Sequence, residues 1–252
     1  MNRVIAIANQ KGGVGKTTTA VNLSASLAYL GEEVLLVDID PQGNATSGLG
    51  IERDRIRGCI YDVLINEMPI ERVTVDTKYE RLRAVPASIQ LAGAEVELVL
   101  SISREVKLKE ALSAIADKYS IIIIDCPPSL GLLTLNALTA ASSVIIPIQC
   151  EYYALEGLGQ LMNTINLVKK HLNPNLYIEG VVLTMFDVRT NLSAQVAEEV
   201  KNYFNEMVYR NIIPRNVRLS EAPSYGKPII EYDPRSKGSE VYLGLAREVI
   251  DR

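Results

Sequence analysis

The sequence predicts an α/β fold in which a mostly parallel, twisted sheet carries helices on both faces. Short apolar runs rich in β-branched residues alternate along the chain with longer segments of helical period. A glycine-rich turn joins the first apolar run directly to a helical segment, and acidic residues end two later runs. This order of elements is typical of a parallel sheet with helical connections.

The individual elements follow from the same patterns. We expect strands at the apolar runs Val4 to Ala8, Val34 to Ile39, Leu82 to Pro86, Ile121 to Ile124, Val144 to Ile148, Ile178 to Met185 and Val208 to Ile213. We expect helices at Thr17 to Tyr29, Leu91 to Leu100, Val106 to Lys118, Leu132 to Ala141, Leu155 to His171, Leu192 to Asn205 and Ser239 to Ile250. Weaker periodicity from Gly43 to Lys78 predicts a small excursion from the sheet. No linker or repeat divides the 252 residues, so we expect a single domain over residues 1–252.

The composition argues against several classes of protein. A formal net charge of -4 provides no global basic field, so contact with nucleic acid must come from a local patch. Three widely spaced cysteines predict neither a disulfide framework nor a zinc site. The apolar runs are far shorter than the roughly 20 residues of a membrane span. The first strand begins close to Met1 and leaves no room for a signal peptide, so we expect a cytoplasmic protein.

The glycine-rich turn is a predicted phosphate-binding loop. It consists of Lys11, Gly12, Gly13, Val14, Gly15, Lys16, Thr17 and Thr18. A turn that ends a strand and opens a helix aims backbone N–H groups and the positive helix end at an anion. Lys16 would then contact the β- and γ-phosphates, and the Thr17 hydroxyl would bind Mg²⁺. The usual pattern has glycine where this chain has Gln10, which makes Lys11 an additional lysine; the alternative is an ordinary tight turn.

Carboxylates end two of the predicted strands. Ligands of open α/β sheets bind outside the carboxyl ends of the strands. Asp125 is therefore the candidate Mg²⁺ carboxylate, with a helix cap as the alternative role. Asp38 and Asp40 lie two residues apart at the end of the other run. The loop-side Asp40 suits the orientation of an attacking water, and Asp38 suits support of Mg²⁺, although sequence position leaves the reverse assignment open.

With these pieces assembled, the chain resembles the ParA and MinD class of P-loop ATPases, which has a deviant Walker A motif, and within it the short chromosomal ParA proteins. The resemblance covers essentially the whole chain. Its motifs are KGGVGKTTT at Lys11 to Thr19, VDIDPQGNATSGLG at Val37 to Gly50, IIIDCPPSLGLLT at Ile122 to Thr134, EYYALEGL at Glu151 to Leu158, and IPRNVRLSEAPSYGKPI at Ile213 to Ile229.

The resemblance implies a weak ATPase with ATP and Mg²⁺ as cofactors. In this family the additional lysine, here Lys11, crosses an ATP-bound homodimer to the phosphates of the opposite subunit, so Lys11, Lys16 and Asp40 would have catalytic roles. A crossing lysine would compensate the charge of two facing nucleotides and make dimerisation depend on ATP. A late loop contacts adenine in similar proteins, which indicates Pro214 and Asn216. The alternatives are a solvated Lys11 and a simple turn at the late loop.

The resemblance also implies that the dimer binds double-stranded DNA without sequence preference. Basic residues of the C-terminal half would make the contacts, and the alternative for each is a surface ion pair. The candidates are Arg189, Arg210, Arg215, Arg218 and Lys227, led by Arg189 and Arg218, with Lys237 as a further candidate. Dimerisation would double the phosphate contacts, so DNA affinity would rise with ATP and fall with salt. A ParB-type centromere-binding protein would stimulate hydrolysis and release the ATPase from the nucleoid.

Two other functions share the phosphate-binding loop. A MinD-like ATPase controls spatial positioning from a membrane through a basic amphipathic helix, which the acidic end from Leu245 to Arg252 does not match, so we expect no membrane partner. A relative of the nitrogenase iron protein would need two exposed cysteines for a bridging cluster. We expect Cys126 and Cys150 to be buried, and His171 to end a helix rather than act as a base.

Overall fold

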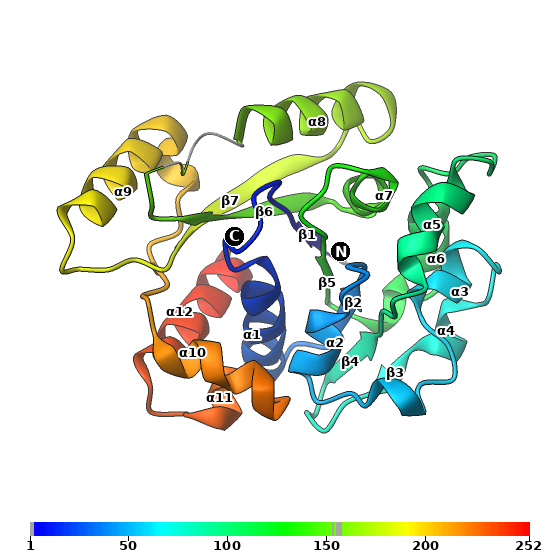
Figure 1. The fold of residues 1–252 in the computed structure, drawn as a ribbon, viewed down its shortest axis with the longest axis horizontal. Coiled ribbons are helices and arrows are strands. Elements are labelled where there is room, and N and C mark those ends of the chain that lie inside the picture. Colours follow the sequence, from blue (N-terminus) through cyan, green and yellow to red (C-terminus); the bar gives the residue numbers. More distant parts are fainter. Residues whose placement is uncertain (1–2, 153, 155–157) are drawn as a thin grey trace.

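A seven-stranded sheet forms the centre of the molecule, in the strand order β3-β4-β2-β5-β1-β6-β7 (Figure 1). The structure is a computed structural model that describes residues 3–152, 154 and 158–252. Six strands are parallel: β1 (Arg3–Ile7), β2 (Val34–Asp38), β4 (Leu82–Val85), β5 (Ile121–Asp125), β6 (Ser143–Gln149) and β7 (Tyr177–Thr184). The edge strand β3 (Val75–Asp76) is antiparallel to β4. The predicted α/β class with a mostly parallel sheet is confirmed.

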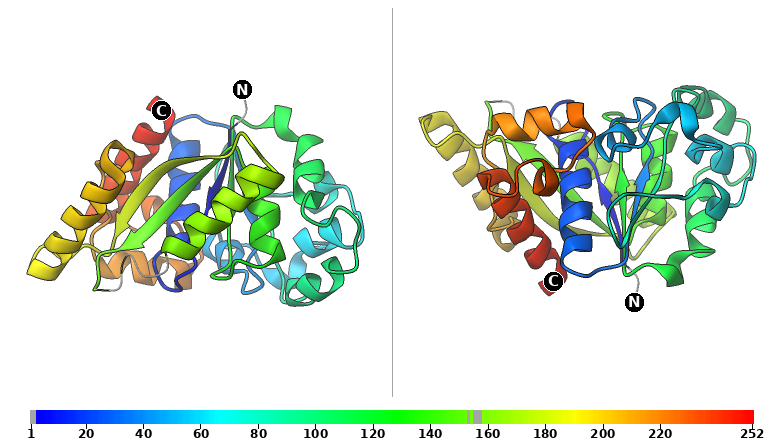
Figure 2. Two further views of the ribbon diagram at one scale, coloured as in Figure 1. Left: turned by 90° about the horizontal axis from the view of Figure 1, so that it is seen from above. Right: turned by 90° about the horizontal axis from the view of Figure 1, so that it is seen from below.

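Helices cover both faces of this sheet (Figure 2). Side chains alternate along each strand, so Ile5 and Ile7 of β1 pack on one face and Ala6 packs on the other. The first face carries α1 (Lys16–Tyr29), α2 (Asn44–Gly48), α10 (Val217–Glu221), α11 (Ile229–Tyr232) and α12 (Lys237–Asp251). The second face carries α3 (Ile60–Leu64), α4 (Ile70–Val73), α5 (Leu91–Leu98), α6 (Lys107–Ser113), α7 (Leu132–Ala140), α8 (Leu158–His171) and α9 (Asn191–Phe204).

Several local predictions can be compared with these elements. The excursion expected from Gly43 to Lys78 contains α2, α3, α4, β3 and the single 3-10 turn η1 (Arg53–Arg55). His171 ends α8, and Cys126 and Cys150 are buried, as expected. The helix start expected at Leu155 and part of the Glu151 to Leu158 motif lie outside the described residues. Within the described part of the chain, no helix is both long enough and apolar enough to cross a membrane.

The strand expected from Val208 to Ile213 is wrong. This segment runs beside β7 without forming a strand: it makes the isolated bridge between Val181 and Val208, and the N–H groups of Tyr209 and Ile213 donate to β7 carbonyls at 2.9 and 2.8 Å. The reason lies in α12, where the Glu248 carboxylate accepts hydrogen bonds from the backbone N–H groups of Arg210 (2.9 Å) and Asn211 (2.8 Å). Because a side chain takes these two amide donors, they are not available for a continuous ladder with β7.

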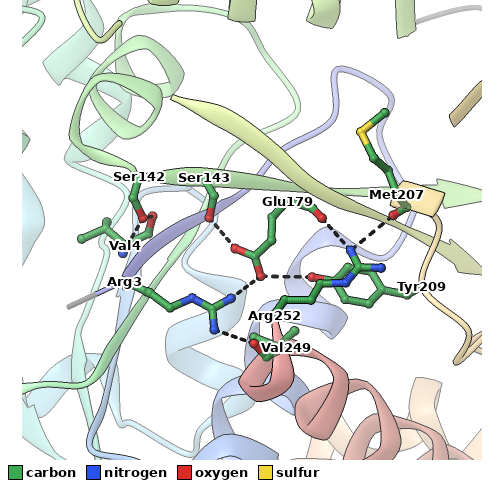
Figure 3. Close-up of polar contacts among 9 residues, drawn as sticks. All are labelled: Arg3, Val4, Ser142, Ser143, Glu179, Met207, Tyr209, Val249 and Arg252. Atoms are coloured by element: carbon green, nitrogen blue, oxygen red, sulfur yellow. Dashed lines mark hydrogen bonds and ion pairs between the residues drawn. The ribbon is translucent and has the colours of Figure 1, made fainter. Parts of the chain in front are cut away.

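A buried polar network joins the amino ends of three strands to the C-terminal helix (Figure 3). Its centre is Glu179, which lies where the register of β6 and β7 shifts by one residue, so the bulge turns its side chain toward Arg3. The Glu179 carboxylate accepts hydrogen bonds from Arg3 (2.7 Å), from Tyr209 (3.1 Å) and from Ser143. The Arg252 guanidinium lies 3.9 Å from the centre of the Tyr209 ring. This network closes the sheet at the edge opposite the carboxyl ends of the strands.

Candidate nucleotide and metal site

The glycine-rich loop is fixed by the ends of neighbouring strands. The Thr184 hydroxyl, at the end of β7, donates to the Val14 carbonyl at 2.8 Å. Asn9 accepts a hydrogen bond from the Lys11 N–H at 3.0 Å and donates to the Pro147 carbonyl at 2.7 Å. Gly13 and Gly15 have φ of 73° and 87°, a region that side chains other than glycine rarely adopt. The sequence therefore forms an open turn at the start of α1, with the loop anchored on both sides.

Lys16 lies under this turn, where it faces three acidic or polar groups. Its side chain is buried, and its ammonium donates to the Lys11 carbonyl at 3.0 Å. Burial lowers the pKa of Lys16, while the charges of Asp125, Cys126 and Asp40 oppose that shift. A buried ammonium with few hydrogen bonds favours an anionic ligand in front of the loop.

Asp38 and Asp125 are direct neighbours at the carboxyl ends of two adjacent strands. They are register partners of the β2–β5 pair, and both are buried. Burial raises the pKa of Asp38 to about 6, with the Thr46 hydrogen bonds opposing the shift. Burial and the charge of Asp38 raise the pKa of Asp125 well above its usual range, while the nearby Thr17 hydroxyl and Lys16 act against this.

This pair of carboxylates fits a divalent cation. Both carboxylate oxygens of Asp125 are buried, and neither forms a well-aligned hydrogen bond to a described residue, although the Thr17 hydroxyl is close enough to oppose the rise in the Asp125 pKa. Buried acceptors of this kind require a cation or water to compensate their desolvation. The described residues form no group of three or more His, Cys, Asp or Glu side chains that could hold a metal by themselves. The pair of Asp38 and Asp125 suits Mg²⁺, which keeps several waters and binds through one or two carboxylates and the phosphates of its ligand.

Asp40 lies on the loop that leaves β2, and this loop is held from two sides. The Asp40 N–H donates to Asp38 at 3.1 Å, and the Asp40 carboxylate accepts from the Gln42 N–H at 2.9 Å. The Arg53 guanidinium donates to the carbonyls of Gln42 and Gly43, the latter at 2.7 Å. Asp40 also lies close enough to Lys16 and Asp125 for its charge to act on both groups: besides the larger effect of burial, this charge acts to raise the pKa of each.

Sequence reasoning missed Arg53 and Thr46 as parts of this site. Arg53 stands in a segment without clear periodicity, and its partners are backbone carbonyls, which leave no mark in the sequence. Thr46 is 1% exposed and donates to Asp38 from both its N–H (2.8 Å) and its hydroxyl (2.7 Å). The available signal is that Thr46 lies inside the Val37 to Gly50 motif and that Arg53 follows this motif by three residues.

A cavity of about 280 Å³ adjoins the loop on the side of the late segment. Pro214 and Asn216 line it together with Gly15 and Thr18 of the loop region. The side-chain oxygen Oδ1 of Asn216 caps α10 by accepting a hydrogen bond from the Arg218 N–H at 2.8 Å. This bond fixes the orientation of the Asn216 side-chain amide. A larger cavity, of about 590 Å³, lies away from the loop between Tyr29, Tyr79 and Glu231. The smaller cavity thus adjoins the predicted phosphate-binding loop, whereas the larger cavity does not have loop residues among its lining.

The candidate basic residues lie at the surface, and most have an acidic neighbour. Arg189 forms two hydrogen bonds with Asp187, at 2.8 and 2.6 Å. Arg218 pairs with Glu221 at 3.0 Å, and Lys227 pairs with Glu231 at 2.9 Å. Lys237 likewise pairs with Glu240 at 2.7 Å. Arg215 is exposed and forms no ion pair within the described residues, and its N–H donates to the Phe186 carbonyl at 2.9 Å. The hydrogen bonds from Arg189 lower the pKa of Asp187, and the charge of Arg215 contributes to this shift.

Known proteins share both the sequence and the fold. Residues 2–178 match the family described as an AAA domain. The chain is 68% identical over 249 residues to the sporulation initiation inhibitor protein Soj of Bacillus subtilis (strain 168), covering 99% of this chain and 98% of that protein. It is 61% identical to the chromosome partitioning protein ParA of Myxococcus xanthus (strain DK1622), covering 100% of this chain and 89% of that protein. The chain belongs to the ParA/Soj family of P-loop ATPases.

Solved structures extend this ParA/Soj assignment to the three-dimensional fold. The cobyrinic acid a,c-diamide synthase of Mycobacterium smegmatis, with bound ADP and magnesium, superposes with a TM-score of 0.87 at 40% identity, covering 99% of this chain and 94% of that one. The septum site-determining protein MinD of Pyrococcus horikoshii OT3, complexed with Mg-ADP, gives 0.83 at 28% identity, covering 99% and 96%. The ParA/Soj chain therefore shares its sheet and loop arrangement with proteins crystallised with a magnesium nucleotide.

Proposed function

We propose that this protein is a chromosome-partitioning ATPase that dimerises with ATP, binds DNA without sequence preference and is released when a ParB-type protein stimulates hydrolysis. The observation that carries the proposal is the combination of the additional Lys11 with a buried carboxylate pair in front of Lys16. Relatives at 68% and 61% identity over nearly the full length are named Soj and ParA. We further propose that residues 1–252 act as one domain in the cytoplasm, on the nucleoid.

The loop residues Gly12 to Thr18 would bind the phosphates of ATP, with Lys16 at the β- and γ-phosphates. Thr17, Asp38 and Asp125 would hold Mg²⁺, directly or through water. The buried Asp125 oxygens, which lack a well-aligned hydrogen bond, support this role. Bound Mg²⁺ would neutralise charge on the phosphates. Pro214 and Asn216 would contact the base in the 280 Å³ cavity.

Asp40 and Lys11 would complete the hydrolytic site. Asp40 lies beside the metal carboxylate on a loop, where its carboxylate can orient a water against the terminal phosphate. Lys11 stands at the outer side of the loop, half-exposed. In a dimer its ammonium would reach the phosphates of the facing subunit, so closure of the dimer would require the charge of ATP.

DNA would bind to the surface of the C-terminal half that carries Arg189, Arg215, Arg218 and Lys227. In the ion pairs of Arg189, Arg218 and Lys227 the cations are exposed, but only the Arg218–Glu221 pair is exposed on both sides, and exposed pairs contribute little free energy. A phosphate can therefore replace Glu221 at small cost, whereas the partly buried Asp187 and Glu231 hold Arg189 and Lys227 more firmly. A dimer presents this surface twice, which makes DNA binding dependent on ATP.

The test combines three variants in the presence of ATP and Mg²⁺. We expect Asp40→Ala to accumulate as a dimer on DNA without turnover, and Lys11→Ala to remain monomeric and unbound. Arg215→Glu should still dimerise but lose about tenfold or more in DNA affinity, with a smaller salt slope. Arg72→Glu, an exposed arginine on α4, is the matched control. Size exclusion and fluorescence anisotropy with two unrelated duplexes give the readouts.

Three results would reject parts of the proposal. Loss of dimerisation in Arg215→Glu would place that residue outside the DNA surface. ATP turnover that responds neither to DNA nor to a ParB-type protein would argue against partitioning. ATP-dependent pelleting with liposomes would favour the MinD-like alternative instead.

A further inference from the structure

Thr46 connects the candidate metal carboxylate to the segment that leads into α5. Its hydroxyl donates to Asp38 Oδ2 at 2.7 Å and accepts from the Ala87 N–H at 3.0 Å. Its own N–H donates to the same Asp38 oxygen at 2.8 Å. Thr46 and Ala87 are both buried, so water does not substitute for these bonds. One side chain thus links the end of β2, the start of α2 and the loop after β4.

The direction of this hydrogen-bond chain is fixed. A hydroxyl has one proton, and because the Ala87 amide already donates to the Thr46 oxygen, the hydroxyl proton points to the Asp38 carboxylate. Consecutive bonds of this kind polarise one another in a buried site. A residue without a hydroxyl would leave the Ala87 N–H without its partner and would leave Asp38 Oδ2 with the Thr46 N–H alone.

The same chain reaches an exposed apolar surface. Ala87 lies four residues before Leu91, the first residue of α5, and α5 buries Leu91, Ala94 and Leu98. Its outer side exposes Val96 (73%) and, just beyond the helix end, Leu100 (88%). A shift of Asp38 would therefore act, through Thr46 and the Ala87 backbone, on the position of this helix.

We propose that Thr46 is a positioning residue that orients Asp38 toward the metal site and couples the occupancy of that site to the segment from Ala87 to Leu98. The inference rests on the proposed ATPase function. Thr46 would act on the metal through the Asp38 carboxylate, to which its hydroxyl and its N–H both donate. It gives the ATPase a route by which bound magnesium nucleotide changes the surface formed by α5.

The experiment uses the full chain with two substitutions at this position. Thr46→Val keeps the shape of the side chain but removes the hydroxyl, whereas Thr46→Ser retains it. Ser47→Ala is the matched control, because the Ser47 hydroxyl is the next one along α2 and bonds only to the Gly43 carbonyl, at 3.2 Å. The readouts are kcat and KM for ATP, the Mg²⁺ concentration that half-saturates binding of a fluorescent ADP, and hydrogen exchange across residues 87–98.

We expect Thr46→Val to lower kcat and to raise the half-saturating Mg²⁺ concentration, each by about tenfold or more, as is typical when the partner of a metal-binding group is removed. Protection of residues 87–98 by Mg-ADP should disappear in Thr46→Val and persist in Thr46→Ser and Ser47→Ala. An unchanged Mg²⁺ requirement, or protection that persists in Thr46→Val, would overturn the proposal and leave Thr46 a purely structural residue.

Two further comparisons keep this result interpretable. If Thr46→Val does not fold, exchange of the Ala87 amide in the wild-type chain decides the matter: it must slow by about tenfold with Mg-ADP, and unchanged exchange refutes the coupling. If the wild-type chain binds no magnesium nucleotide at all, the proposed ATPase function fails as well. Normal nucleotide binding with no effect of Thr46→Val rejects the positioning role alone.

Discussion

At the scale of single residues, the candidate site contains a pair of buried carboxylates whose charged forms destabilise the free protein. Asp38 and Asp125 stand side by side, buried, at the ends of neighbouring strands, and neither Asp125 oxygen forms a well-aligned hydrogen bond to a described residue. Burial raises the pKa values of both carboxyls, so their charged forms are less stable in the folded chain than in the unfolded chain. The free protein therefore loses stability as the pH rises through the range in which they ionise. A cation relieves this cost, which couples stability to ligand binding.

Asp125→Asn should make the free protein more stable and remove its response to magnesium nucleotide. At pH 8 in EDTA, where the charge cost is present, we expect the free energy of unfolding to rise by about 1 to 3 kcal/mol. Added Mg-ADP should stabilise the wild-type chain but not the variant. Chemical denaturation followed by circular dichroism measures both effects. Asp117→Asn, at an exposed position, is the control, and a less stable Asp125→Asn would indicate a capping role instead.

At the scale of elements, short segments outside the sheet hold the loop from Asp40 to Gly43. The turn η1 supplies Arg53, which donates to the carbonyls of Gln42 and Gly43 in this loop. Gly43 has φ of 60°, and a Cβ atom there would lie 3.0 Å from Arg53 and 3.2 Å from the Ala87 carbonyl. The excursion between β2 and β4 thus acts as a support for Asp40.

Arg53→Ala should loosen this loop and slow hydrolysis with little effect on nucleotide affinity. Two charge-assisted hydrogen bonds are lost, so we expect kcat to fall by about tenfold. Arg55→Ala is the matched control: it lies in the same turn and pairs only with the exposed Glu52. Steady-state ATP turnover and Kd for a fluorescent ADP separate the two effects. Equal kcat in both variants would contradict a supporting role for Arg53.

At the scale of the whole molecule, the two edges of the sheet have different roles. The carboxyl ends of the strands carry the candidate nucleotide and metal site, whereas the network around Glu179 lies at the opposite end of the strands (Figure 3). That network ties β1, β7 and the end of α12 together, and the buried Glu179 carboxylate in it is paired with Arg3. We expect this network to contribute to stability.

Glu179→Gln should destabilise the fold without changing ATP turnover per folded molecule. The change weakens the buried pair with Arg3 and the bonds from Ser143 and Tyr209, so we expect the free energy of unfolding to fall by about 2 to 3 kcal/mol. Glu240→Gln, which affects an exposed pair with Lys237, should change it by less than about 0.5 kcal/mol. Urea denaturation measures both. A fall in ATP turnover per folded molecule of Glu179→Gln would instead link this end of the sheet to catalysis.

The sequence by itself determined the α/β class, six of the seven expected strands and the positions of the loop and carboxylates, because apolar period and strand-end chemistry are local properties. The local pattern gave a wrong prediction at Val208 to Ile213. The Glu248 carboxylate of α12 accepts two backbone N–H groups of this apolar run, so the run does not form a continuous strand beside β7. Only the tertiary structure placed Asp38 beside Asp125 and brought Arg53 and Thr46 to the site. These contacts depend on strand register and on hydrogen bonds that involve backbone groups. Packing of the folded chain determines which residues meet in this way, so the contacts cannot be predicted from sequence periodicity.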